Sequence, residues 1–270
     1  MTLEPILLNL FFLLSAILAP IMTNPFFLNH SSSYKKAHIF TVIIIVLSFI
    51  FHFKFGYISW PIFCLYGVYL RIKGFYSNTP KKDFLVSLIP FVFSLIGATW
   101  FIAAVFDLYL LGYDQAWSSV ALMHSNFLGW LLTGCIAYLS TKATRGRSQV
   151  YRLSSYLLLI SFIFIALGIY LDLFIKSIGI FILILAALVS FTLHAYDLRK
   201  DRNISSSLSI ASLSTLIVTL GLAIINEYAF SLPELHRNFL FMIRGHGLIN
   251  ALIVIPSFYY SIRLNRKQRF

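Results

Sequence analysis

Apolar runs of about 20 residues recur along the whole chain, and they restrict its fold more than any other feature. The run over residues 178–198, for example, holds a single charged residue. A helix of ~20 apolar residues crosses the ~30 Å hydrocarbon core of a bilayer. Only 11% of the 270 residues are charged and the mean hydropathy is +0.86, so too little polar sequence remains to coat a soluble core. The sequence therefore predicts an all-α, polytopic transmembrane helical bundle embedded in the lipid bilayer.

Nine candidate spans follow from the apolar runs and the polar breaks between them. They cover roughly residues 4–22, 38–54, 57–73, 84–107, 117–141, 152–175, 178–198, 207–227 and 239–262. The second and third nearly touch at "FKFGYISWP", where a single re-entrant hairpin would also fit. No soluble domain, low-complexity tract or internal repeat is visible, so residues 1–270 are interpreted as a single integral membrane domain.

The basic residues give the orientation. With the N-terminus outside, all but four of the 21 Lys and Arg residues fall in inner loops or at the inner end of a span; the exceptions are Lys54, Lys176, Arg237 and Arg244. This asymmetry is what the positive-inside rule predicts for an N-out, C-in chain. A pair of missed or surplus spans would preserve it, so the predicted count is about nine, within seven to nine. The net charge of +12 comes from these short runs, which argues against nucleic-acid binding.

Two histidines are predicted to share a depth in the membrane. His124 and His246 each lie seven residues inside the outer boundary of their span, which places both imidazoles ~10 Å below that boundary. Ionisable groups inside a membrane are expensive and are commonly functional. His246 and Asn250 are four residues apart and so share a helix face, and Gly245 and Gly247 leave room beside the histidine.

Acidic and basic residues complete the candidate site. Arg244 lies two residues before His246 and is expected to face the bundle interior, with Asp107 or Glu227 as its acidic partner. The candidate catalytic residues are therefore His124, His246, Arg244, Asn250, Asp107 and Glu227.

Two segments carry a family resemblance. "ALMHSNFLGWLLTGCIAYL" and "RGHGLINAL" resemble the best-marked segments of the YndJ-like bacterial membrane proteins, the second through His246, Gly247, Asn250 and Ala251. The resemblance implies a multi-pass protein of the bacterial cytoplasmic (inner) membrane. It singles out residues more than it names a reaction.

Three classes of function fit these residues. The first is a cofactor-independent acid–base enzyme, of the isomerase, cyclase or epoxide-opening hydrolase type, acting on a lipophilic small molecule in the outer half of the bilayer. His246 and His124 would exchange protons, Arg244 and Asn250 would hold an oxyanion, and Asp107 or Glu227 would orient them.

The two alternatives are a haem- or metal-binding protein and a protein that catalyses no reaction. His124 and His246 could be the two axial ligands of a haem, or could bind zinc together with Asp107. A transporter or a structural membrane subunit would use the same residues to line a vestibule. The inner halves of the two His-bearing spans, "LLTGCIAYLS" and "ALIVIPSFYYS", are largely apolar, which favours a one-sided pocket. The enzyme with no cofactor is the preferred hypothesis.

Overall fold

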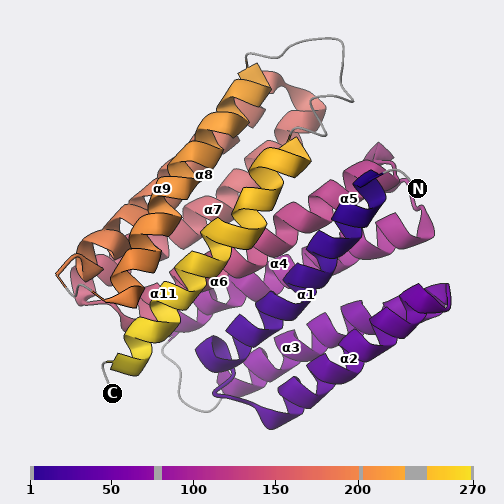
Figure 1. Cartoon of the computed structure of the whole chain (residues 1–270), viewed down its shortest axis with the longest axis horizontal. Helices are drawn as coiled ribbons and strands as arrows, with labels where there is room; N and C mark the ends of the chain where they lie inside the picture. The colour runs from indigo at the N-terminus through magenta and orange to yellow at the C-terminus, as the bar shows by residue number, and fades with distance from the viewer. Residues whose placement is uncertain (1–2, 76–80, 201–202, 229–241, 269–270) are drawn as a thin grey trace. The chain divides into compact units, whose positions relative to one another are not determined.

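The computed structural model describes residues 3–75, 81–200, 203–228 and 242–268, and within them every regular element is a helix. The chain divides into two compact units, Met1–Thr141 and Lys142–Phe270. Both units are coloured by residue number in Figure 1. The predicted all-helical class is confirmed for the described residues, whereas the prediction of one domain stays a prediction.

The first unit begins with a long helix, a shorter helical hairpin and a fourth helix. These are α1 (Leu3–Phe27), α2 (Ser32–Ile50), the 3-10 turn η1 (Lys54–Ile58), α3 (Ser59–Phe75) and α4 (Lys81–Phe106). After the turn η2 (Leu110–Gly112), one continuous helix closes the unit in three parts: α5 (Gln115–His124), the π-helical η3 (Ser125–Leu132) and α6 (Thr133–Lys142). Asp114 caps this helix by accepting a hydrogen bond from the Trp117 amide at 2.9 Å.

The second unit contains three long helices and a final helix with two π-helical parts. Its elements are α7 (Arg145–Leu171), α8 (Leu173–Leu198), α9 (Ile204–Tyr228), η4 (Met242–Gly247), η5 (Asn250–Val254) and α11 (Ile255–Gln268). Asp172 alone links α7 to α8: its backbone ends the first helix, and its carboxylate accepts from the Phe174 amide at 2.7 Å to start the second. The α7–α8 pair is therefore a tight helical hairpin (Figure 1).

Eight helices of the described chain are long and apolar enough to cross a membrane. They correspond to eight of the nine predicted spans, with ends that differ by several residues; the predicted span 152–175, for instance, is Arg145–Ile169. The remaining predicted span, 57–73, is the separate helix α3, which has 17 residues and is not one of these eight helices. The chain is thus a multi-pass membrane protein by its helices, and a ninth span and the orientation stay predictions.

Aromatic side chains fill the core of the first unit. The ring of Phe12 stacks on Phe101 with centroids 4.1 Å apart and meets Trp60 edge-on at 5.5 Å. Trp60 in turn lies 6.0 Å from Trp130, and both indoles are fully buried. The indole N–H of Trp130 donates to the hydroxyl of Thr23 at 2.8 Å. This core fixes α1, α3, α4 and η3 against one another, and so positions the helix that carries His124.

Candidate functional site

Both segments singled out by their histidines depart from ordinary α-helix. The helix changes to π-helix directly after His124, in η3, and again around His246 and Asn250, in η4 and η5. The amide of Ile255, for example, bonds to the carbonyl of Asn250, five residues earlier. These are the only π-helical turns in the part of the chain that the structure describes. Such turns are rare and occur frequently at functional sites, because the wider turn re-aims side chains.

His246 is held by groups on α9 and on its own helix. Its Nδ1 lies 2.9 Å from the carbonyl oxygen of Thr219. A carbonyl only accepts, so Nδ1 carries a hydrogen and, in the neutral ring, Nε2 is the acceptor. The side-chain amide nitrogen of Asn250 lies 3.1 Å from that Nε2 and 3.3 Å from Nδ1, and of the two only the unprotonated Nε2 can accept its hydrogen. The ring is half-buried, and its orientation and tautomer are both set by these two bonds.

Thr219 closes the network. Its hydroxyl lies 3.0 Å from the amide oxygen of Asn250 and 3.0 Å from the carbonyl oxygen of Leu216. The hydroxyl has a single hydrogen, so these two oxygens compete for it. Thr219 is fully buried and Asn250 is 8% exposed. His246, Asn250 and Thr219 therefore form one connected cluster, called here the His246 triad.

The His246 triad accommodates both protonation states of the ring. If Nε2 gains a proton, rotating the Asn250 amide by 180° presents its oxygen to Nε2–H and its NH2 to the Thr219 hydroxyl. Thr219 then donates to the Leu216 carbonyl alone, so the hydrogens on Nε2, on the side of the amide that faces Thr219 and on the Thr219 hydroxyl each have an acceptor. No helix has to move for this exchange. The cluster can thus accept and return a proton at a fixed ring position.

His124 lies in the first unit with an exposed side chain. Its Nδ1 bonds to the carbonyl oxygen of Val120, one turn back on α5, at 2.9 Å. The Nδ1 hydrogen is therefore used, and Nε2, the acceptor of the neutral ring, has no hydrogen-bond partner among the described residues. His124 and His246 belong to different units, so their predicted common depth stays a prediction.

The other four predicted site residues fare differently. The structure brings Asn250 together with His246, as their four-residue spacing predicted. Asp107 is exposed at the end of α4, with a positive φ of 55° and no hydrogen-bond or ion-pair partner for its carboxylate among the described residues. The backbones of Arg244 and Glu227 lie in η4 and α9, but their side chains lie outside the described part of the chain, and so does the predicted Arg244 ion pair.

Asn126, two residues after His124, has a packing role. It is fully buried, and its amide donates to the Ser15 hydroxyl on α1 at 3.0 Å. Its amide oxygen faces the backbone of Gly97 on α4 so closely that a Cβ there would collide with it. Asn126 therefore locks α1, α4 and η3 together, whereas the exposed His124 takes no part in this contact.

Sequence reasoning missed Thr219. It is one of several hydroxyl residues along α9, at Ser205, Ser206, Ser207, Ser209, Ser212, Ser214, Thr215 and Thr219, and nothing in their spacing distinguishes it. Its part in the site depends on a contact between residues 31 positions apart. Knowing that α9 packs on the last helix would have selected it.

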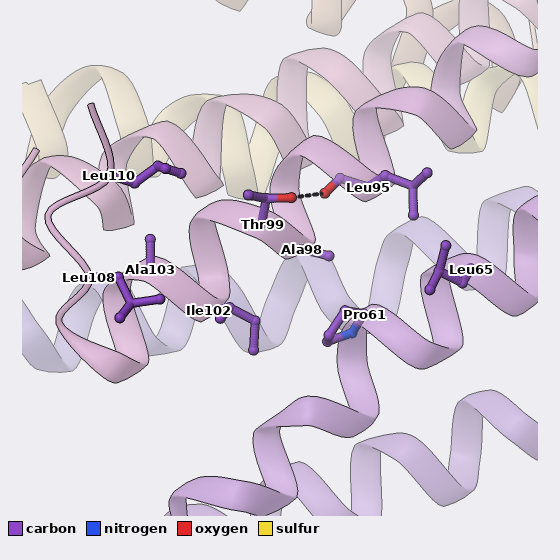
Figure 2. Close-up of a pocket in the computed structure, with 9 residues that line it drawn as sticks. All are labelled: Pro61, Leu65, Leu95, Ala98, Thr99, Ile102, Ala103, Leu108 and Leu110. Carbon is purple, nitrogen blue, oxygen red and sulfur yellow. Dashed lines mark hydrogen bonds between the residues drawn. The ribbon is translucent and has the colours of Figure 1, made fainter.

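The structure offers no local set of metal ligands, but it does contain a sizeable apolar cavity. Among the described residues, no three His, Cys, Asp or Glu side chains gather as a metal site requires. A cavity of about 470 Å³ lies in the first unit beside α3 and α4, and Figure 2 shows its lining. Nine residues line it: Pro61, Leu65, Leu95, Ala98, Thr99, Ile102, Ala103, Leu108 and Leu110. Its one hydroxyl, on Thr99, donates to the Leu95 carbonyl, so the cavity suits hydrocarbon and carries no acid–base group.

Comparison with known proteins gives a family match and no individual relative. The family described as YndJ-like protein matches residues 17–254, which includes both His-bearing segments. No curated protein and no solved structure matches the chain.

Proposed function

The chain belongs to the YndJ-like family, and we propose that it is an intramembrane acid–base enzyme acting on a lipophilic small molecule. His246 gives a proton to the substrate or takes one from it. The observation that carries this proposal is the His246 triad, in which one amide rotation matches the hydrogen bonds to either protonation state. A group that must cycle between acid and base needs such an environment.

The remaining residues have supporting roles in this proposal. Asn250 is bonded to His246, so the role we propose for it is holding the ring, in place of the oxyanion contact expected from its sequence position. Arg244 holds the developing oxyanion, and Asp107 or Glu227 orients the cation. His124, in the other unit, stays the predicted counterpart acid or base, as its sequence position suggested. Isomerisation, cyclisation and epoxide opening each need one proton delivered and one removed, as this set provides.

The geometry favours acid–base chemistry over a haem or zinc ligand. Both ring nitrogens of His246 already have hydrogen-bond partners, and a metal would have to displace Asn250 from Nε2. Transport is less well supported, because hydroxyls of α6 are bonded to carbonyls of the same helix. Thr133 donates to Gly129 and Thr141 donates to Tyr138, so the hydrogens of both hydroxyls are used within the helix.

Solvent deuterium tests the proposal whichever lipophilic molecule is the substrate. The protein in proteoliposomes is incubated in D2O with a lipophilic extract of bacterial membranes and a panel of lipophilic epoxides and alkenes, followed by mass spectrometry. We expect at least one compound to gain deuterium in a time-dependent way. Isomerisation and cyclisation deliver a solvent-exchanged proton to carbon, where the deuterium is retained, and hydrolytic epoxide opening adds the elements of a solvent water, which the product mass also records.

Two variants separate chemistry from folding. His246→Gln removes the titratable ring but retains hydrogen-bonding capacity, and we expect it to abolish deuterium uptake while the protein still purifies as a folded species. Thr219→Ser keeps the hydroxyl and should retain uptake. Equal uptake in wild type and His246→Gln, or none in any compound with wild type, would overturn the proposal.

A further inference from the structure

A buried arginine lies far from the His246 triad in the sequence, on α3 of the first unit. Arg71 is only 8% exposed. Burying a guanidinium costs several kcal/mol unless its charge is compensated. The groups around it therefore indicate what compensates that charge.

One neutral hydroxyl is the partner that the described residues supply. Nε of Arg71 donates to the Ser87 hydroxyl on α4 at 3.0 Å, and Nη2 donates to the same oxygen. Ser87 passes its own hydrogen to the Phe84 carbonyl at 2.7 Å, and the Phe84 ring lies 5.4 Å from the guanidinium carbon. A guanidinium has five N–H groups, so three remain without a partner among the described residues.

No described carboxylate neutralises this charge. Asp83 is the sole acidic residue between Pro5 and Phe106. The one ion pair among the described residues joins Arg147 to Asp197, in the other unit. Arg71 is thus a buried cation with unused donors and no anionic partner within the described part of its unit.

The position of Arg71 matches the headgroup level of a bilayer. It lies four residues before the end of α3 at Phe75, or ~6 Å along the helix axis. Tyr69, an interface-type residue, is exposed nearby in the sequence. The end of α3 and the start of α2 lie at the same end of the unit (Figure 1), and Lys35, Lys36 and Lys73 are exposed there. The charge asymmetry of the sequence predicts that this end is cytoplasmic.

We propose that Arg71 binds the phosphate of an anionic phospholipid in the cytoplasmic leaflet. The guanidinium N–H groups that have no partner among the described residues offer the planar, two-pronged geometry that phosphate oxygens accept. The exposed lysines add attraction for a net negative headgroup. A lipid headgroup and inorganic phosphate would both present phosphate oxygens to Arg71. The experiment distinguishes between these two ligands.

Lipid retention is the test. The protein is reconstituted in nanodiscs of phosphatidylglycerol and phosphatidylcholine in equal amounts, re-extracted in mild detergent, and its bound lipids are counted by native mass spectrometry. Wild type should retain phosphatidylglycerol several-fold over phosphatidylcholine. Arg71→Gln should lose most of that preference, and Lys54→Gln, an exposed lysine in η1 at the other end of α3, should keep it.

A second variant and a competition with inorganic phosphate complete the test. If Arg71→Gln does not fold, Arg71→Lys keeps the charge without the planar fork and should reduce the preference. Displacement of the lipid by millimolar inorganic phosphate would assign the site to free phosphate and overturn the lipid proposal. An unchanged preference in both Arg71 variants would also overturn it. None of these results depends on whether His246 is catalytic.

Discussion

At the scale of single residues, Thr219 and Asn250 are joined by a buried hydrogen bond between two helices, and its strength is measurable. Hydrogen bonds between membrane helices average ~0.6 kcal/mol in double-mutant cycles, with a maximum near ~1.7. We expect Thr219→Val and Asn250→Leu each to lower the free energy of unfolding, and their cycle to give a coupling energy within that range. The free energy of unfolding is measured in mixed detergent micelles for the wild type, the two single variants and the double variant. Strict additivity of the two substitutions would show that the contact is not formed.

Part of the site was predictable from sequence and part was not. His246 and Asn250 follow from periodicity, because a four-residue spacing places two side chains on one helix face. Asn126 lies two residues from His124 in the sequence, and only the structure shows that it has a packing contact with Ser15. Thr219 needed the packing of α9 on the last helix, and periodicity within one helix contains no information on that contact.

At the scale of elements, the α7–α8 hairpin depends on a close approach at Gly168. A Cβ at this position would collide with the backbone of Lys176, on the neighbouring helix. We expect Gly168→Ala to destabilise the protein by ~1–3 kcal/mol, since a backbone cannot move aside as a side chain can. Gly146→Ala is the matched control in the same helix, because nothing lies within 4 Å of a Cβ there. Thermal unfolding that is equally affected by both substitutions would contradict the packing.

The π-helical turns mark the limit of prediction at this scale. Apolar periodicity predicted helices through both His-bearing segments, and helices are found there. It could not distinguish α-helix from π-helix, because the two share hydrophobic composition and differ by one residue per hydrogen-bonded ring. In η3 the change coincides with Gly129, whose missing side chain admits the ring of Phe93. That contact depends on α4, a separate part of the chain.

At the scale of the whole molecule, helix α3 decides how many times the chain crosses the membrane. At 17 residues it spans ~26 Å, close to the lower limit for a crossing. If it crosses, Lys54 before it and Lys73 after it lie on opposite sides. We expect Lys54→Cys to react in intact cells with a membrane-impermeant maleimide and Lys73→Cys to react only after the membrane is opened. Cys64 and Cys135 are buried, so the wild type should stay unlabelled. Labelling of both variants from the same side would reduce the count to eight.

The overall class was accessible from sequence because the membrane imposes a length and a composition on every span. The sequence could not decide whether short apolar runs near the length limit, such as residues 57–73, cross the membrane, since a helix of that length can also end within the bilayer interface. The ends of the helices shifted for a related reason: hydropathy marks the apolar part of a helix, and caps such as Asp114 and Asp172 set where it begins.

The central claim is that His246 cycles between two protonation states at a fixed position. Solid-state 15N NMR of histidine-labelled protein in bilayers, with His246→Gln to assign the signal, measures this directly. We predict a neutral ring protonated on Nδ1 at high pH, which becomes protonated on both nitrogens on acidification while the protein stays folded. A ring that remains neutral down to the pH at which the protein unfolds would make His246 a structural residue and contradict the account.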